Sequence, residues 1–336
     1  MSLETIYVVR HGFRCSYFVD PVSGVATTTV LSPTKIAADT PLTAHGVDQA
    51  RQLGAHLMSL EPPIDAVYSS PYYRCLQTIS PYISLRNEQA AKSQEESGAL
   101  LTPLVIRSET GLGEFYGQAH FDQPKPAQMS FLKTLFPVLD DSFESGVVAE
   151  KKGESIEGLY DRVRSAVEKI IERCDAEGVR SVILCSHAAV IIALGRVLTG
   201  QIPDRVDVQD FDTFTCGLSI FKRPTTLSSN YSSTLADLDV SVQSPDGADD
   251  QAADTAKPVP VTSSTTGSTD TAQKPTRLVG NWICQANSDC SFLSGGPERG
   301  WYFTGDEAFI FGDPVPSGDA ASGLPDDIAA LHTSRL

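Results

Sequence analysis

A short apolar run near the N-terminus, residues 6–9, is followed directly by the tripeptide Arg10-His11-Gly12. The run is rich in β-branched and aromatic residues, which is typical of a buried strand in an α/β sheet. In such sheets ligands bind outside the carboxyl ends of the strands. His11 lies at that edge, with the Arg10 guanidinium next to it in the chain. The tripeptide therefore predicts a nucleophile beside a cation.

A second apolar run ends in the same way. Residues 181–186 read as a buried strand that leads to His187, and residues 188–198 have the apolar character of a buried helix. The carboxyl ends of neighbouring parallel strands lie at the same edge of a sheet. We therefore expect His187 to lie near His11.

The strand-like residues 66–68 lead into a segment that carries helix-start signals. Ser70 suits the N-cap position and Pro71 suits the first helical position, so Arg74 falls in the first turn. There, free backbone N–H groups and the helix dipole favour an anion. The segment predicts an arginine placed to bind an anionic group.

A glycine-rich turn at residues 111–116 follows the strand-like residues 104–106 and carries a single carboxylate, Glu114, among apolar and aromatic side chains. Burial in such surroundings disfavours the charged form of a carboxyl group. The sequence therefore predicts a raised pKa for Glu114, as a proton donor requires.

These segments bring two histidines, several arginines and a carboxyl group to one edge of the predicted sheet. A neutral imidazole can attack phosphorus and carry the phosphoryl group covalently. Guanidinium groups bind phosphate oxygens in a bidentate manner, and a carboxylic acid can protonate the leaving oxygen. The set therefore indicates phosphoryl transfer.

With these residues, the chain resembles the histidine phosphatases, or phosphoglycerate mutase-like superfamily, over about residues 3–222. The resemblance implies an α/β fold with a three-layer, doubly wound, mostly parallel sheet. It implies that His11 is the nucleophile, that Arg10 and Arg74 bind phosphate, and that His187 is the second catalytic histidine and a further phosphate ligand. It also implies that Glu114 is the proton donor.

Two positions depart from the common pattern of this family. Many members have glutamate directly after Arg-His-Gly, whereas this chain has Phe13 and then Arg14, which resembles the first motif of the acid phosphatase branch. Arg14 is therefore expected to be a third phosphate ligand. That branch takes its proton donor from an aspartate after the second histidine, but Ala188 stands there. Glu114 is thus the better candidate.

The wording of the motifs at residues 9–14, 41–50, 71–79 and 113–116 is similar to that of a fungal subgroup. This subgroup includes the phosphatase-domain subunit of transcription factor IIIC of the RNA polymerase III system. Three functions stay open: a phosphomonoesterase that acts through a phosphohistidine, an assembly subunit that retains the phosphatase fold, and a mutase-type phosphotransferase. A phosphate ester is the expected substrate.

Composition limits the binding partners and the cellular location that we expect for this chain. The 336 residues carry a formal net charge of -16, so a basic face for direct nucleic-acid binding is not expected. No membrane-spanning run is visible, and seven scattered cysteines form no disulfide or metal-ligand pattern. We expect no metal, no cofactor and no membrane contact, and a cytoplasmic or nuclear location.

Composition also divides the chain. Residues 1–223 form the expected phosphatase domain, and residues 224–276, rich in Ser, Thr, Ala, Asp, Pro and Gly, form an expected disordered linker. Residues 277–315 read as a small β-rich segment that holds both tryptophans, with strand-like runs at 278–283, 300–303 and 308–311, and residues 316–336 as a flexible tail. The β-rich segment packs either on its own domain or on a protein partner. Every predicted site residue precedes the linker, so removal of the rest is expected to spare activity.

Overall fold

The computed structural model describes residues 2–97, 102–224 and 278–305. A six-stranded sheet runs in the order β5-β4-β6-β1-β7-β8. Its first four strands are parallel, and β7 and β8 are antiparallel to their neighbours. The strands are β1 (Thr5–Arg10), β4 (Ala66–Ser69), β5 (Ile106–Ser108), β6 (Ser181–Ser186), β7 (Leu218–Lys222) and β8 (Ile283–Asp289).

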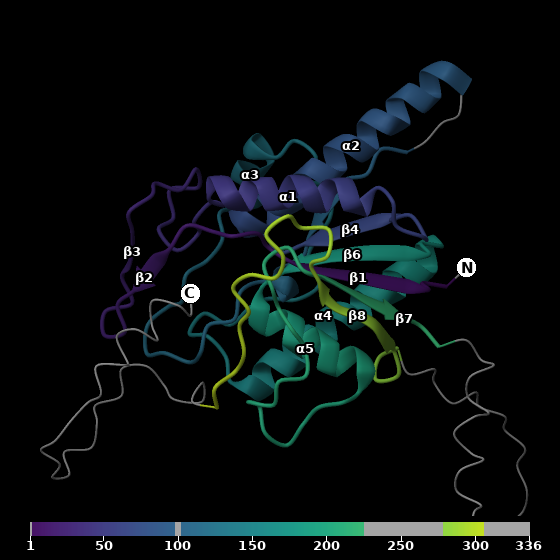
Figure 1. Cartoon of the computed structure of the whole chain (residues 1–336). Helices are drawn as coiled ribbons and strands as arrows, with labels where there is room; N and C mark the ends of the chain where they lie inside the picture. The colour runs from purple at the N-terminus through teal and green to yellow at the C-terminus, as the bar shows by residue number, and fades with distance from the viewer. Residues whose placement is uncertain (1, 98–101, 225–277, 306–336) are drawn as a thin grey trace, which may run out of the picture. The chain divides into compact units, whose positions relative to one another are not determined.

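Helices cover both faces of this sheet (Figure 1). Alternate strand residues point to opposite faces, so Ile6 and Val8 pack toward one helical layer and Tyr7 and Val9 toward the other. One layer holds α4 (Ile156–Glu177) and α5 (Ala188–Thr199). The other holds α1 (Ala44–Leu57), α2 (Tyr73–Ser97) and α3 (Met129–Leu135). The expected three-layer, mostly parallel α/β architecture is confirmed.

Local capping signals set the helix starts. The Thr43 side chain accepts a hydrogen bond from the Gly46 N–H at the start of α1, and Ser155 accepts one from Gly158 at the start of α4. Helix α4 ends at Gly178, which has a left-handed conformation with φ of 73°. These ends are encoded by the residues themselves.

The parallel strands converge on one edge of the sheet. Strands β1 and β6 are in register with Arg10 opposite Ser186, so His11 and His187 both emerge directly after the last paired residues. Strand β4 leads to α2, and β5 leads to the short 3₁₀ helix η1 (Thr110–Leu112), just before Glu114. This edge is where ligands bind in open α/β sheets.

The residues after position 277 join the same sheet. Strand β8 pairs with β7, and the buried Trp282 and Phe303 pack into the core beside α4 and α5. Cys290 and Leu293 pack on the opposite face with α1 and α2. Regular strand structure covers Ile283–Asp289, later than the expected run at 278–283, while residues 300–303 are not a strand. The described part of this segment therefore packs on its own domain.

Several expectations fall outside the described residues: the disordered linker, except residue 224, the strand-like run 308–311, and the tail 316–336. Outside the main sheet, β2 (Tyr17–Val19) and β3 (Ala26–Thr28) form a small antiparallel pair. No helix in the described part is long and apolar enough to cross a membrane.

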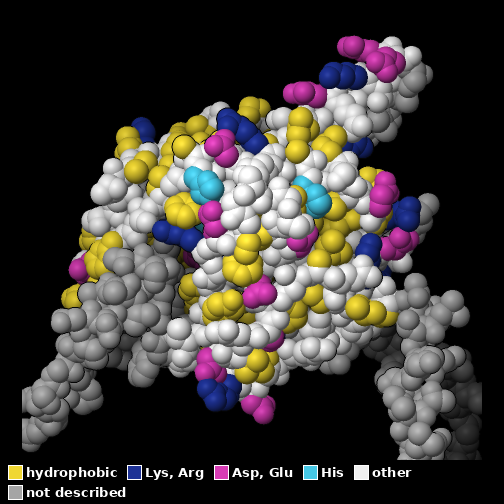
Figure 2. Space-filling view, in the orientation of Figure 1, with side chains coloured by type: hydrophobic (Ala, Val, Ile, Leu, Met, Phe, Trp, Pro, Cys, Tyr) yellow, Lys and Arg dark blue, Asp and Glu magenta, His cyan; other side chains and the backbone are white. Residues whose placement is uncertain are grey.

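Figure 2 shows one face of the molecule, on which Lys and Arg side chains are interspersed with Asp and Glu. On this face the described residues form no continuous basic field. Counterion release from nucleic acid depends on such clustering of positive charge. The face shown carries charges of both signs.

Candidate active site

His11 follows β1 directly and is buried, with 2% of its surface exposed. Its Nδ1 lies 2.8 Å from the Gly12 carbonyl oxygen. A carbonyl oxygen only accepts hydrogen bonds, so this contact assigns the proton to Nδ1 and leaves a lone pair on Nε2. Gly12 is required here because a Cβ atom would lie 2.8 Å from the Gly46 carbonyl oxygen.

His187 is the N-cap residue of α5 and is completely buried. Its ring lies edge-on to that of His11, with the ring centroids 5.3 Å apart. Its Nδ1 is 3.1 Å from Oε2 of Glu114, and its Nε2 is 2.8 Å from the Ser70 hydroxyl. The structure therefore brings together the two histidines and the carboxylate that the sequence placed after separate strands.

Arg74 lies in the first turn of α2, as predicted, and is fully buried. Its Nη2 donates to Oε2 of Glu114 at 3.0 Å, and its guanidinium lies over the Tyr72 ring, 4.6 Å from the centroid. Its Nε is buried without a hydrogen-bond partner among the described residues. Most buried donors have a partner, so a vacant donor in a cluster of cations is typical of a site for an anion.

Arg10 and Arg14 flank the same cluster. Arg10 donates through Nη1 to the carbonyl oxygens of Thr213 and Arg299, at 2.6 and 2.5 Å. Arg14 donates to the Cys15 carbonyl oxygen at 2.9 Å. Burial lowers the pKa of Arg10 to about 10 and also lowers that of Arg14, with further lowering by the neighbouring arginines. Both groups stay charged near neutral pH.

Charge in this cluster shifts the titration of both His11 and Glu114. Burial, together with Arg74 and His187, lowers the pKa of His11 well below its ordinary value, so its imidazole is neutral. Burial raises the pKa of Glu114, but His187 and Arg74 outweigh burial and hold it well below the usual range. The expected raised pKa of Glu114 is therefore wrong, because the turn's own sequence does not contain its cationic partners.

The titration of His187 moves in the opposite direction. Burial lowers its pKa, but the adjacent Cys75 and Glu114 side chains more than reverse this, and the net pKa is raised. The carboxylate of Glu114 thus stabilises an imidazolium at His187. The raised pKa of His187 and the lowered pKa of His11 thus belong to two neighbouring rings of the site.

Two contacts around α2 differ from those expected. Ser70 was expected to cap the helix, but its hydroxyl lies 2.8 Å from Nε2 of His187. The hydrogen bond that it accepts from the Tyr72 N–H is longer, at 3.4 Å. Helix α2 begins at Tyr73, whose N–H donates to the buried carboxylate of Asp39 at 2.8 Å. Asp39 is 34 residues away in the chain, so no local pattern marks it as a cap.

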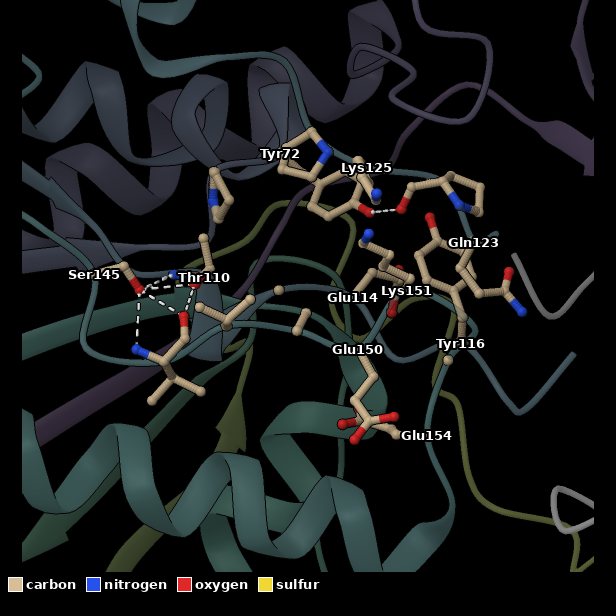
Figure 3. Close-up of a pocket in the computed structure, with 18 residues that line it drawn as sticks. Tyr72, Thr110, Glu114, Tyr116, Gln123, Lys125, Ser145, Glu150, Lys151 and Glu154 are labelled. Carbon is tan, nitrogen blue, oxygen red and sulfur yellow. Dashed lines mark hydrogen bonds between the residues drawn. The ribbon is translucent and has the colours of Figure 1, made fainter. Parts of the chain in front are cut away.

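A cavity of about 470 Å³ opens on the other side of Glu114. Its walls include the rings of Tyr72 and Tyr116, and the Tyr72 hydroxyl donates to the Pro124 carbonyl oxygen at 2.8 Å (Figure 3). No local sequence pattern marks this cavity, because its walls come from residues 71–72, 110–126 and 145–154.

Comparison with known proteins decides the family. The model of the histidine phosphatase superfamily (branch 1) matches residues 6–97 and 102–225, well over half of the chain. This chain belongs to the histidine phosphatase superfamily. All the site segments described above lie within the matched residues.

Two curated relatives of this histidine phosphatase were found. It is 28% identical over 313 residues to the transcription factor tau 55 kDa subunit of Saccharomyces cerevisiae, a match that covers 90% of the chain and 59% of the relative. It is 29% identical over 177 residues to the ecdysteroid-phosphate phosphatase of Drosophila melanogaster, a match that covers 51% of the chain and 21% of the relative. The chain thus spans less than two thirds of the length of either relative.

Similar solved structures include the ecdysone phosphate phosphatase of Bombyx mori in complex with tungstate, at 20% identity and a TM-score of 0.45. That match covers 74% of this chain and 98% of the other. A phosphoglycerate mutase from Bacillus anthracis matches at 18% identity and a TM-score of 0.39, with coverages of 66% and 89%.

The histidine phosphatase site also has the residue types of a metal centre. One ligand atom each from His11, Glu114 and His187 lie within 4.8 Å of one another. However, the Arg74 guanidinium lies 3.0 Å from the Glu114 carboxylate and 3.3 Å from Nδ1 of His187, where a metal would have to bind both. A fixed cation already neutralises this carboxylate, so the donor set does not fit a metal ion.

Proposed function

We propose that this chain is a phosphomonoesterase that forms a phosphohistidine on His11. The observation that carries the proposal is the protonation and hydrogen bonding of His11. Its imidazole is neutral, and its Nδ1 is hydrogen-bonded to the Gly12 carbonyl oxygen, which leaves the Nε2 lone pair for attack. Around it lie cations that attract a phosphate dianion. Covalent catalysis by a group of this kind divides one difficult hydrolysis into two easier steps.

Arg10, Arg14, Arg74 and His187 are the proposed phosphate ligands. Nε of Arg74 is a buried donor with no partner among the described residues, and the pKa of His187 is raised, which favours its charged form. Arg10 and Arg14 interact electrostatically with Arg74. Their mutual repulsion is relieved when an anion binds, so the site is organised for a charged ligand before it arrives.

Glu114 is the proposed proton donor. Arg74 and His187 hold its carboxyl group ionised, but a phosphate dianion would neutralise their field and so raise the pKa of Glu114. As Nε2 of His11 bonds to phosphorus, the ester P–O bond breaks and the Glu114 proton passes to the leaving oxygen. Water then attacks phosphorus and returns a proton to Glu114, while the P–N bond breaks and inorganic phosphate leaves.

Labelling tests the proposal. Full-length protein is mixed with a ³²P-labelled ester and denatured in alkali, which preserves phosphohistidine. We expect label on His11, and neither label nor turnover in His11→Ala. The matched control is His120→Ala, because His120 is an exposed histidine. Label on another residue, or full turnover in His11→Ala, would overturn the assignment.

A second function is supported by a separate observation. The similarity to the tau 55 kDa transcription factor subunit extends over 90% of the chain and so beyond the phosphatase motifs. We propose that the chain also serves as an assembly subunit of transcription factor IIIC, with a nuclear location. Affinity capture from the source cells should recover subunits of that factor equally with wild-type protein and His11→Ala. Failure to recover any of them from nuclear extract would refute this role.

A further inference from the structure

We propose that the cavity beside Glu114 binds the alcohol part of the ester, and that this part is bulky and apolar. The inference rests on the proposed phosphatase function and names its substrate class. Aryl phosphates and phosphate esters of polycyclic alcohols are of this class. A three-carbon sugar-acid phosphate is not.

Glu114 fixes the direction of the leaving group. A general acid must lie within hydrogen-bond reach of the oxygen that it protonates. Oε2 of Glu114 contacts Arg74 and His187, which are proposed phosphate ligands, and Glu114 also lines the cavity. The leaving oxygen therefore lies between the phosphate site and the cavity, and the rest of the alcohol extends into the cavity.

Tyr72 joins the two parts of the site. Its ring lies edge-on to His187, with centroids 5.3 Å apart, and under the Arg74 guanidinium, while it also lines the cavity. Its hydroxyl is held by the Pro124 carbonyl oxygen (Figure 3). An apolar group in the cavity would therefore contact a rigid aromatic wall directly beside the phosphate.

The size and lining of the cavity select the class. At about 470 Å³ it is within the range of sites that hold drug-sized ligands. Much of its wall is apolar: Pro71, Tyr72, Tyr116, Pro124, Pro126 and Val147. A small polar alcohol would leave most of this surface in water, whereas a large apolar alcohol would bury it and gain binding free energy in proportion to the area.

The cavity wall is braced against the turn that carries Glu114. Arg162 donates to the carbonyl oxygens of Gly111 and Gly113 at 2.8 and 3.0 Å and to Glu154 at 2.9 Å. The Glu154 N–H in turn donates to the Tyr116 carbonyl oxygen at 3.1 Å. The subsite and the acid therefore form one packed unit, and the cavity is formed before a ligand binds.

A series of esters tests the proposal on the wild-type protein. In 4-alkylphenyl phosphates from methyl to pentyl the acidity of the leaving phenol is nearly constant while its size grows. We expect kcat/KM to rise up to about fourfold for each buried methylene group. It should exceed kcat/KM for glycerol phosphate and 3-phosphoglycerate. A flat or falling series with measurable turnover would overturn the subsite alone, whereas no turnover of any ester would overturn the phosphatase function.

A charged substitution in the cavity wall provides a second test of the subsite. Val148→Asp places a carboxylate at the mouth of the cavity, and Val148 is 90% exposed, so the fold should tolerate it. We expect the gain in kcat/KM with alkyl length to shrink, because an alkyl chain that approaches the new carboxylate would remove water from it. The matched control is Val22→Asp, because Val22 is 72% exposed and outside the cavity. An unchanged series in Val148→Asp would argue against the assignment.

A last experiment distinguishes two kinds of molecule that could carry the apolar alcohol. A tyrosine-phosphorylated peptide presents an aryl phosphate on a protein, whereas a polycyclic alcohol phosphate is a small molecule. Faster turnover of either one than of glycerol phosphate supports an apolar alcohol and shows its source. Slower turnover of both would contradict the proposal.

Discussion

Nη1 of Arg10 donates to the main-chain oxygen of Arg299 at 2.5 Å, across 289 residues of sequence. The Arg299 guanidinium in turn lies over the Phe13 ring, 4.1 Å from its centroid. Phe13 is held from the other side, where its N–H donates to Gln49, and the Gln49 amide donates to Glu298 at 3.2 Å. The segment before and after Arg299 therefore braces the loop that carries His11.

Removal of everything after residue 224 should impair the proposed phosphatase activity, contrary to the expectation from the sequence. The truncation deletes β8, the buried Trp282 and Phe303, and the carbonyl that holds Arg10. Loss of several large buried side chains costs several kcal/mol, of order 3–5 per aromatic residue. We expect a lower melting temperature and a fall in kcat/KM of more than about tenfold.

A nicked chain is the control for that truncation. A protease site placed within residues 225–277 cuts the chain but leaves the β7–β8 pairing and the Arg10–Arg299 contact in place. Nicked protein should keep its activity and elute as one species. Equal activity of the truncated and full-length proteins would show that the segment does not support the site.

Glu114→Gln should slow alkyl phosphates more than aryl phosphates with acidic leaving groups. An alkoxide needs a proton as it leaves, and acid catalysis contributes about 10²–10⁴-fold, while a nitrophenolate needs little help. The measurement is kcat/KM on both substrate types. Glu88→Gln is the control, because Glu88 is exposed and does not line the cavity. An equal loss on both substrates would assign Glu114 to binding or structure.

His11 should remain neutral in mildly acidic solution. Burial and the neighbouring cations lower its pKa, so the protonated form appears only well below pH 6.5. ¹⁵N NMR of histidine-labelled protein, assigned with His11→Asn, should show no titration of this imidazole between pH 7 and about 6. Half-protonation near pH 6.5 would contradict the electrostatic account of the nucleophile.

Arg162→Lys should act on catalysis through Glu114. Lysine keeps the positive charge, but it does not reproduce the planar fork that reaches Gly111, Gly113 and Glu154 together. We expect kcat for alkyl phosphates to fall about tenfold or more, with KM and kcat for nitrophenyl phosphate little changed. The control is Arg164→Lys, a change on the same helix. A uniform loss on both substrates would mean a structural role alone.

The sequence by itself determined the buried strands β1, β4 and β6, the starts of α1 and α4, and the order in which the site residues occur. Apolar periodicity marks β1, β4 and β6, and Thr43 and Ser155 cap their helices through bonds to N–H groups three residues away. Parallel strands have their carboxyl ends at one edge, which is why His11, Arg74 and His187 could be expected together.

Only the tertiary structure decided the contacts made across the chain. Asp39 caps α2, Ser70 bonds to His187, and Arg299 holds Arg10, each over a separation that leaves no local pattern. The same holds for the pKa of Glu114: its own turn favours a raised value, but Arg74 and His187 lie within about 3 Å of its carboxylate and lower it. Electrostatic and hydrogen-bond energies depend on distance in space, so they follow from the folded arrangement and not from neighbours in sequence.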